Sequence, residues 1–143
     1  MVADIEILRK KLAEMDTYVN ELQKLQTYSL DELRGNLTNL WSVAHGLQLV
    51  IQIILDVGNH ILADRGIKAL DYTEVIDLLG QEKVIPREFA VKVRGMAGFR
   101  NVLVHGYSSL DVKKVYEILQ KNLADFSQFA LYIWSFLDQE GKV

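Results

Sequence analysis

The sequence predicts an all-α protein, folded as an up-and-down bundle of four to five helices. Apolar residues recur at steps of three and four along most of the chain. The one proline is Pro86 and the nine glycines are scattered, so few positions interrupt a helix. A chain of 143 residues has the length of one domain, and we assign residues 1–143 to a single helical domain. Short connections between long helices favour antiparallel neighbours.

The first two predicted helices have recognisable ends. The first runs from about Asp4 to Thr27, with apolar residues in a nearly heptad stripe. The second covers roughly Leu30 to Asp64. Ser29 and Glu32 have the spacing of a capping box at its start, and Gly66 is suited to end it.

The remaining predicted helices follow the same logic. A short helix near residues 73–79 has Asp71 or Thr73 as its cap and Gly80 after it. A fourth helix runs from Arg87 to about Val104, because Pro86 suits a first turn and Gly106 lets the chain leave. The last helix covers about residues 111–139, with Ser108 or Ser109 as its cap.

Composition narrows the possible classes of protein. The chain has no cysteine, which excludes disulfides and thiolate metal sites. Residues 1–11 alternate apolar and charged side chains, unlike a signal peptide. The most apolar stretch, residues 47–57, is interrupted by polar side chains and is shorter than the ~20 residues that span a bilayer. We therefore expect a core helix without a membrane anchor, and a cytoplasmic protein.

Charge is distributed unevenly along the sequence. The net charge of -3 argues against a protein that coats nucleic acid. Between residues 87 and 122, however, seven lysines and arginines face three acidic residues. A local basic region of this kind is typical of a site to which RNA is attracted electrostatically, although a count along the sequence is not a surface patch.

The basic region contains the segment with the most chemical potential, residues 100–107. Arg100 is a permanent cation that can hold a phosphate through two hydrogen bonds, and His105 can move a proton near neutral pH. Asn101 and Tyr107 add an amide and a phenol. Together these groups predict RNA phosphodiester cleavage without a metal or another cofactor.

The proposed chemistry uses the nucleophile that RNA itself carries. The 2′-hydroxyl attacks the neighbouring phosphorus after a base removes its proton, and the departing 5′-oxygen then needs a proton. His105 is the candidate base or acid, Arg100 the candidate stabiliser of the phosphorane, and Asn101 the side chain that orients one of them. DNA lacks the 2′-hydroxyl, so this scheme predicts selectivity for RNA.

Helical geometry sets a condition on this site. Arg100 and His105 lie about 140° apart on a continuous helix, since each residue turns the chain by about 100°. Their convergence requires the helix to loosen near residues 104–106, the arginine to wrap around, or a second subunit to contribute its own copy. Asn101 and His105 do share a face. Extending that face backward adds Gly98 and two candidate RNA-binding cations, Arg94 and Arg87.

Less specific interpretations compete with each functional one. Arg100 and His105 also fit a helix end in which the histidine bonds the last carbonyls and the arginine pairs with a carboxylate. Gly95 and Gly98 weaken a helix by about 1 kcal/mol each, so close approach by another backbone or a ligand is a plausible compensation.

The second helix carries a polar face, which comprises His45, Gln48, Gln52, Asp56 and His60. It fits a solvated face, a self-association surface, the wall of a site facing the fourth helix or, least well, a metal site.

The segment from Met96 to Tyr107 closely resembles the signature of the HepT-like toxins of the HEPN superfamily: arginine, a polar residue, three further positions, histidine, any residue, tyrosine. The resemblance extends to the second helix, to residues 72–85 and to residues 110–129. No motif position departs from the pattern. It implies a HEPN-like helical bundle, a homodimer that brings two motifs to a shared cleft, and metal-independent ribonuclease activity.

The resemblance also implies a partner. Members of this family are toxins of two-gene modules, here a type VII-like toxin–antitoxin module, whose antitoxin is a minimal nucleotidyltransferase. The antitoxin transfers AMP to the motif tyrosine, which is Tyr107 here, and the added bulk and negative charge would exclude RNA. An alternative is a non-catalytic subunit that presents a nucleotide or substrate to a nucleotidyltransferase. A third option is a purely structural helical dimer.

Overall fold

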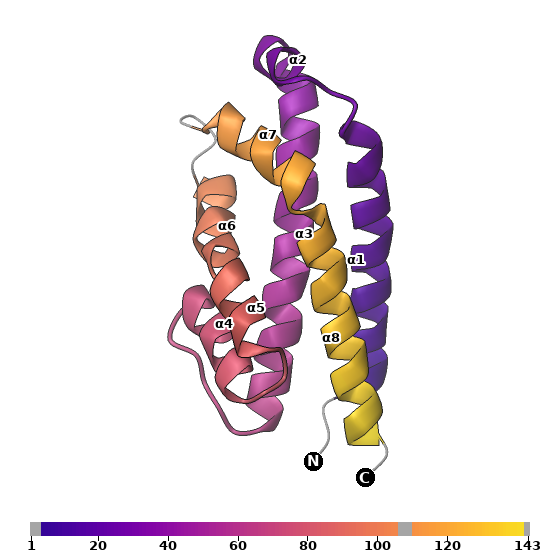
Figure 1. Ribbon diagram of the computed structural model, residues 1–143, viewed down its shortest axis with the longest axis vertical. Helices are drawn as coiled ribbons and strands as arrows, with labels where there is room; N and C mark the ends of the chain where they lie inside the picture. Colours follow the sequence, from indigo (N-terminus) through magenta and orange to yellow (C-terminus); the bar gives the residue numbers. More distant parts are fainter. Residues whose placement is uncertain (1–3, 106–109, 142–143) are drawn as a thin grey trace.

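The helix α3 (Leu37–Asp64) forms the axis of the protein, and the other helices pack along it (Figure 1). The structure is a computed structural model that describes residues 4–105 and 110–141. It confirms the predicted all-α class, since the described residues contain no strand. The remaining helices are α1 (Ile5–Leu25), α2 (Leu30–Gly35), α4 (Tyr72–Gln81), α5 (Arg87–Val93), α6 (Gly95–His105), α7 (Val112–Lys121) and α8 (Leu123–Gly141).

The arrangement around α3 separates two groups of helices. In Figure 1, α1 and α8 run side by side along one flank of α3, while α4, α5 and α6 gather on the other. The short helix α7 crosses at the end where α2 lies, and it contacts α2 and α3. The candidate motif therefore lies on α6, in the group that packs against α3 opposite α1.

The core explains the apolar character of α3. Its residues Val43, Leu47, Ile51 and Ile54 are fully buried, and the helix as a whole contacts helices on both flanks. By length and composition α3 also meets the test for a membrane span, with a mean hydropathy of 1.5 over the best window. However, 56% of that window is buried inside the bundle, as expected for the predicted core helix.

Several predicted helix ends are confirmed by their capping bonds. The side chain of Ser29 accepts a bond from the Glu32 amide, and Glu32 accepts one from the Ser29 amide, which completes the capping box. Asp71 caps α4. Gly66 has a positive φ of 73° after the end of α3, a conformation that glycine adopts without strain.

Three helices that the sequence predicts as continuous are interrupted. The second breaks at Asn36, whose extended backbone and side chain cap α3 by accepting a bond from the Asn39 amide. The fourth breaks at Arg94, ahead of the weak helix former Gly95. The last breaks at Asn122, whose amide bonds the Asp125 carboxylate. In each case a polar side chain or a glycine competes with the continued helix.

The predicted end of the short helix at Gly80 is wrong. Helix α4 continues to Gln81, and the left-handed residue is Lys83, with a φ of 60°. Gly80 serves packing instead, because a Cβ atom there would lie 2.8 Å from the Ala90 Cβ. The predicted caps Ser108 and Ser109, and the predicted exit at Gly106, lie outside the described residues, and Asp111 caps α7.

Close packing between α3 and α4 depends on Gly58. A Cβ atom at this position would lie 2.8 Å from Val75 Cγ1 and 2.9 Å from Leu79 Cδ1. We expect Gly58→Val to lower the free energy of unfolding by about 1–3 kcal/mol, because both neighbours are buried. Urea denaturation measures this. Gly35→Ala is the control, since no neighbour among residues 4–105 and 110–141 lies within 4 Å of its added methyl. Equal midpoints for the two variants would contradict the packing argument.

Candidate active site

Arg100 is held in place by side chains from two helices. It is half-buried on α6, which packs against α3 and α4. Its Nε atom donates a hydrogen bond of 2.8 Å to Gln52 Oε1 on α3, and its Nη1 atom donates one of 3.1 Å to Asn101 Oδ1. These bonds fix the guanidinium in one orientation, although they use only part of its donor capacity.

The guanidinium of Arg100 lies over the ring of Tyr72. The Cζ atom of Arg100 lies 4.8 Å from the centre of this ring, within the range of a cation–π interaction. Tyr72 is the first residue of α4, so the loop before α4 and the cap at Asp71 position it. Neither residue type nor spacing in the sequence marks Tyr72 as a contact of Arg100.

The other described motif residues are exposed. His105 is the last residue of α6, and Asn101 lies one turn earlier on the same face. The side-chain carbonyl of Asn101 accepts from Arg100, and the part of the chain that the structure describes gives its amide nitrogen no acceptor. Tyr107, the predicted modification site, lies outside the described residues.

One predicted route by which Arg100 and His105 could converge was a loosening of the helix near residues 104–106. The helix shows no such loosening up to His105. The helix continues through both Arg100 and His105, so they keep an angular separation of about 140°. Among the described residues, no hydrogen bond joins the two side chains. Convergence on one phosphate then depends on the reach of the arginine or on a second copy of the chain.

The polar face of α3 resolves into different roles. Gln52 lies on the wall that faces α6, as one of the predicted alternatives stated, because it accepts a bond from Arg100. Asp56 accepts a 2.8 Å bond from Gln52 and pairs with Lys11 of α1. His60 instead accepts a bond from the backbone amide of Asp4. His45 is exposed. Within the described residues, no three acidic or histidine side chains are grouped as a metal site would require.

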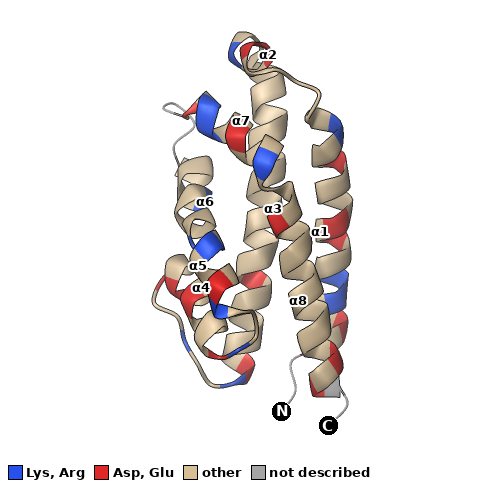
Figure 2. Ribbon diagram, in the orientation of Figure 1, with Lys and Arg blue, Asp and Glu red and all other residues tan. Residues whose placement is uncertain are grey.

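The two further predicted RNA-binding cations are arranged differently from the prediction. The helix break at Arg94 places Arg87 on α5 and leaves the predicted continuous stripe incomplete. Arg94 pairs with Asp77 on α4 through two bonds of 3.0 and 2.9 Å. Hydrogen bonding to Asp77 and then its charge raise the pKa of the Arg94 guanidinium. Figure 2 shows acidic and basic segments intermixed around α4 and α5.

A hollow of about 340 Å³ opens beside Arg100. Its lining includes Asn59 from α3, Leu70 and Tyr72 from the entry to α4, and Asn101 from α6. Leu70 is 86% exposed at its edge. Two of the residues that contact Arg100 therefore also line an open space large enough for part of a ligand.

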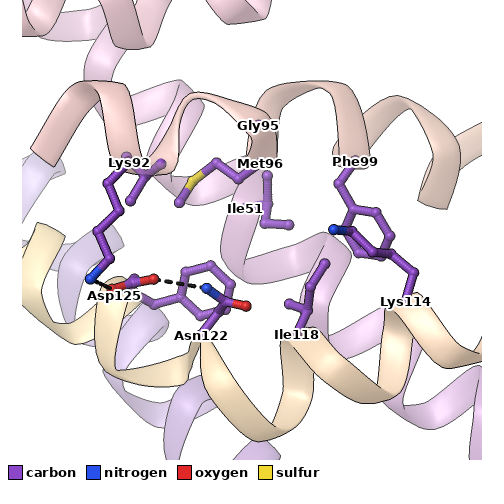
Figure 3. Close-up of a pocket in the computed structure, with 11 residues that line it drawn as sticks. Ile51, Lys92, Gly95, Met96, Phe99, Lys114, Ile118, Asn122 and Asp125 are labelled. Carbon is purple, nitrogen blue, oxygen red and sulfur yellow. Dashed lines mark hydrogen bonds and ion pairs between the residues drawn. The ribbon is translucent and has the colours of Figure 1, made fainter.

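A second hollow, of about 170 Å³, lies on a different face of α6 (Figure 3). Apolar side chains of Met96, Phe99 and Ile118 line it, and at one end Lys92 pairs with the buried Asp125 at 2.9 Å. None of the motif residues Arg100, Asn101 or His105 lines this hollow. Lys92 is one of the seven basic residues between residues 87 and 122, and its charge is paired with that of Asp125.

The arrangement defines a polar site at the end of α6 in an all-helical bundle, suited to phosphate binding and proton transfer. The family model described as "Ribonuclease HepT-like" matches residues 15–133, which include the whole motif. The chain therefore belongs to the HepT-like ribonuclease family, as the motif predicted.

Two characterised relatives cover most of the chain. A protein from Aphanizomenon flos-aquae named tRNA nuclease HepT is 26% identical over 92% of this chain and 90% of its own length. A protein from Shewanella oneidensis named mRNA nuclease HepT is 26% identical over 87% of this chain and 93% of its own. The two names specify different RNA substrates, although both relatives are 26% identical to this chain over the matched residues.

A solved structure supports the same family. It contains a tri-AMPylated HEPN toxin of Shewanella oneidensis in complex with its MNT antitoxin. The match has a TM-score of 0.80 and 26% identity, and covers 90% of this chain and 97% of that one. The helical arrangement in Figure 1 is thus the HEPN fold that the sequence predicted.

Proposed function

We propose that this protein is a metal-independent RNA endonuclease and the toxin of a type VII-like toxin–antitoxin module in the cytoplasm. The observation that carries this proposal is the presentation of Arg100. Gln52, Asn101 and Tyr72 fix the guanidinium, and Asn101 and Tyr72 also line an open hollow. The exposed His105 lies on the same helix as Arg100. A cation held ready for a phosphate and an accessible imidazole are the groups that cleavage by the 2′-hydroxyl needs.

In the proposed reaction His105 acts either as the base that takes the proton of the 2′-hydroxyl or as the acid that protonates the departing 5′-oxygen, and water carries out the other proton transfer. Arg100 stabilises the negative charge of the phosphorane through its free N–H groups. The bond that forms joins the 2′-oxygen to phosphorus and the bond that breaks joins phosphorus to the 5′-oxygen. The products are a 2′,3′-cyclic phosphate and a 5′-hydroxyl.

A homodimer is part of the proposal, because one α6 does not bring Arg100 and His105 together. Two copies that face each other across α6 would place the histidine of one near the arginine of the other. The exposed surface of α6 supports such an approach. Val102 is 43% exposed, and no neighbouring group from the described residues lies within 4 Å of a Cβ atom at Gly98. The close neighbour expected at Gly98 is therefore a partner or a ligand in this proposal.

Incubation of the purified protein with RNA in the presence of a chelator tests the activity. We expect cleavage that leaves 2′,3′-cyclic phosphate ends, and no cleavage of an oligonucleotide with 2′-deoxyribose at every position. Loss of activity in chelator would overturn the metal-independent mechanism. Nucleotide binding without any cleavage would favour the alternative, a non-catalytic partner subunit of a nucleotidyltransferase.

The proposed silencing acts on Tyr107, and the AMPylated Shewanella toxin supports a modification of this kind. We expect Tyr107→Phe to remain toxic when it is co-expressed with the partner nucleotidyltransferase, because it has no phenol oxygen to accept AMP. Intact mass spectrometry should show no added AMP. Tyr28→Phe is the matched control and should still be silenced. Silencing of Tyr107→Phe to the level of the wild type would reject this site.

A further inference from the structure

We propose that Gln52 is a positioning residue that anchors Arg100 without neutralising it, and that Asp56 fixes the orientation of the Gln52 amide. This inference rests on the proposed function, in which Arg100 binds an RNA phosphate. The contact itself is direct: Arg100 Nε lies 2.8 Å from Gln52 Oε1, and the two residues are 48 positions apart in the sequence. Helices α3 and α6 must therefore be packed for it to form.

The orientation of the Gln52 amide decides whether it can hold an arginine. A glutamine side chain has an acceptor oxygen and a donor nitrogen, and an arginine needs the oxygen. Gln52 Nε2 donates a 2.8 Å bond to Asp56 Oδ1, one turn further along α3. Because an ionised carboxylate only accepts, Asp56 holds the nitrogen on its own side and turns the oxygen toward Arg100.

The second carboxylate oxygen of Asp56 faces a counter-charge. Lys11 Nζ on α1 lies 3.9 Å from Asp56 Oδ2. The negative charge of Asp56 is thus balanced in part by a lysine on the opposite side, and the neutral amide of Gln52 stands between Asp56 and the guanidinium. A chain from α1 through α3 to α6 results, in the order Lys11, Asp56, Gln52, Arg100.

Arg94, at the C-terminal cap of α5, is held in the opposite way. There the carboxylate of Asp77 accepts from both Nε and Nη2, which satisfies the charge of the guanidinium within the protein. For Arg100, the group that accepts the bond from Nε is instead the uncharged amide oxygen of Gln52. An amide fixes the geometry while the positive charge remains available to a ligand.

The free donors of Arg100 match this interpretation. Of the five N–H groups that a guanidinium carries, those bonded to Gln52 and Asn101 account for two. The remaining three include both on Nη2, for which the described residues supply no acceptor. The Tyr72 ring covers one face of the plane, so a phosphate would approach along the Nη edge.

Two substitutions at Gln52 separate a positioning role from a structural one. If Gln52 only satisfies a half-buried arginine, Gln52→Glu should preserve function and Gln52→Leu should damage it. Our proposal predicts the reverse order. Gln52→Glu places a negative charge on Arg100 and should lower kcat/KM for RNA cleavage by about 10–100-fold, whereas Gln52→Leu should lower it by less than about 10-fold.

Salt dependence gives a second readout that a structural role would not change. Loss of one phosphate contact should make the slope of log(1/KM) against log salt about 0.7 shallower for single-stranded RNA. We expect this for Gln52→Glu and not for Gln52→Leu. Ser42→Asp is the matched control, because it adds the same charge to α3 about 15 Å away. Activity of Gln52→Glu equal to or above that of Gln52→Leu would overturn the proposal.

Two further measurements keep this test separate from the proposed function. The Nε–H resonance of Arg100 should exchange slowly with water in the wild type and in Gln52→Glu, and quickly in Gln52→Leu. Fast exchange in the wild type would reject the anchor. If the wild type does not cleave RNA, the proposed function fails, and the affinity for a 2′-O-methyl oligonucleotide then tests the charge argument. Equal affinity of the wild type and Gln52→Glu would reject it.

Discussion

Replacing His105 with alanine is expected to lower kcat for RNA cleavage by about 10²–10⁴-fold, the usual contribution of a general acid or base. The imidazole is the one side chain of the described motif that can exchange a proton near neutral pH. His105 is exposed at the end of α6, so its removal should change the free energy of unfolding by less than about 0.5 kcal/mol. Kinetics on a defined RNA, with thermal denaturation in parallel, measure both quantities.

His45→Ala is the control for this variant. His45 is also an exposed histidine, but it lies on α3 and outside the motif. The His45→Ala variant should cleave RNA at the rate of the wild type, and its expression should still arrest growth. If His105→Ala retained full activity while remaining folded, the proton transfer would belong to another group, and the assignment of the site would be wrong.

Helix ends with a local signal were predictable from the sequence. The capping box of Ser29 and Glu32 and the left-handed Gly66 are confirmed because their geometry depends on residues within one turn. The break at Asn36 has a local signal as well, since asparagine is a favoured helix cap, but the apolar periodicity on both sides concealed it.

Other features depend on tertiary contacts and had no local signal. Gly80 reads as a helix stop in the sequence, yet it serves the close contact between α4 and α5. The break at Asn122 coincides with a buried carboxylate, Asp125, that pairs with Lys92 from α5. Packing of one helix against another decides these positions, and a single sequence does not reveal which helices meet.

The residues of the candidate site also fall into those with a local sequence signal and those that only tertiary contacts reveal. The motif residues Arg100, Asn101 and His105 were identifiable by residue type and spacing, and Gln52 belonged to a polar face that was predicted as one possible wall. The ring of Tyr72 under Arg100 was missed because it comes from α4, 28 positions earlier in the sequence. A sequence supplies the chemical groups, whereas the contacts that orient them arise only when α3, α4 and α6 pack together.

The second large effect is expected at Arg100, where even a conservative change should be damaging. Arg100→Lys keeps the positive charge but loses the planar group that bonds Gln52 and Asn101 and stacks on Tyr72. We expect kcat/KM to fall by about 10–100-fold, close to the loss in Arg100→Ala, because a point charge on a flexible stem is not held in one orientation. Steady-state kinetics on the same RNA measure this ratio.

The comparison of lysine with alanine at this position separates charge from geometry. If charge alone were sufficient, Arg100→Lys would approach the activity of the wild type and only Arg100→Ala would be inactive, which would contradict the role given to the anchoring contacts. Arg9→Lys is the matched control, since Arg9 is exposed on α1 and forms only a long pair with Glu6 at 3.9 Å. It should leave the rate unchanged, because a surface pair of this kind contributes little to stability or to the site.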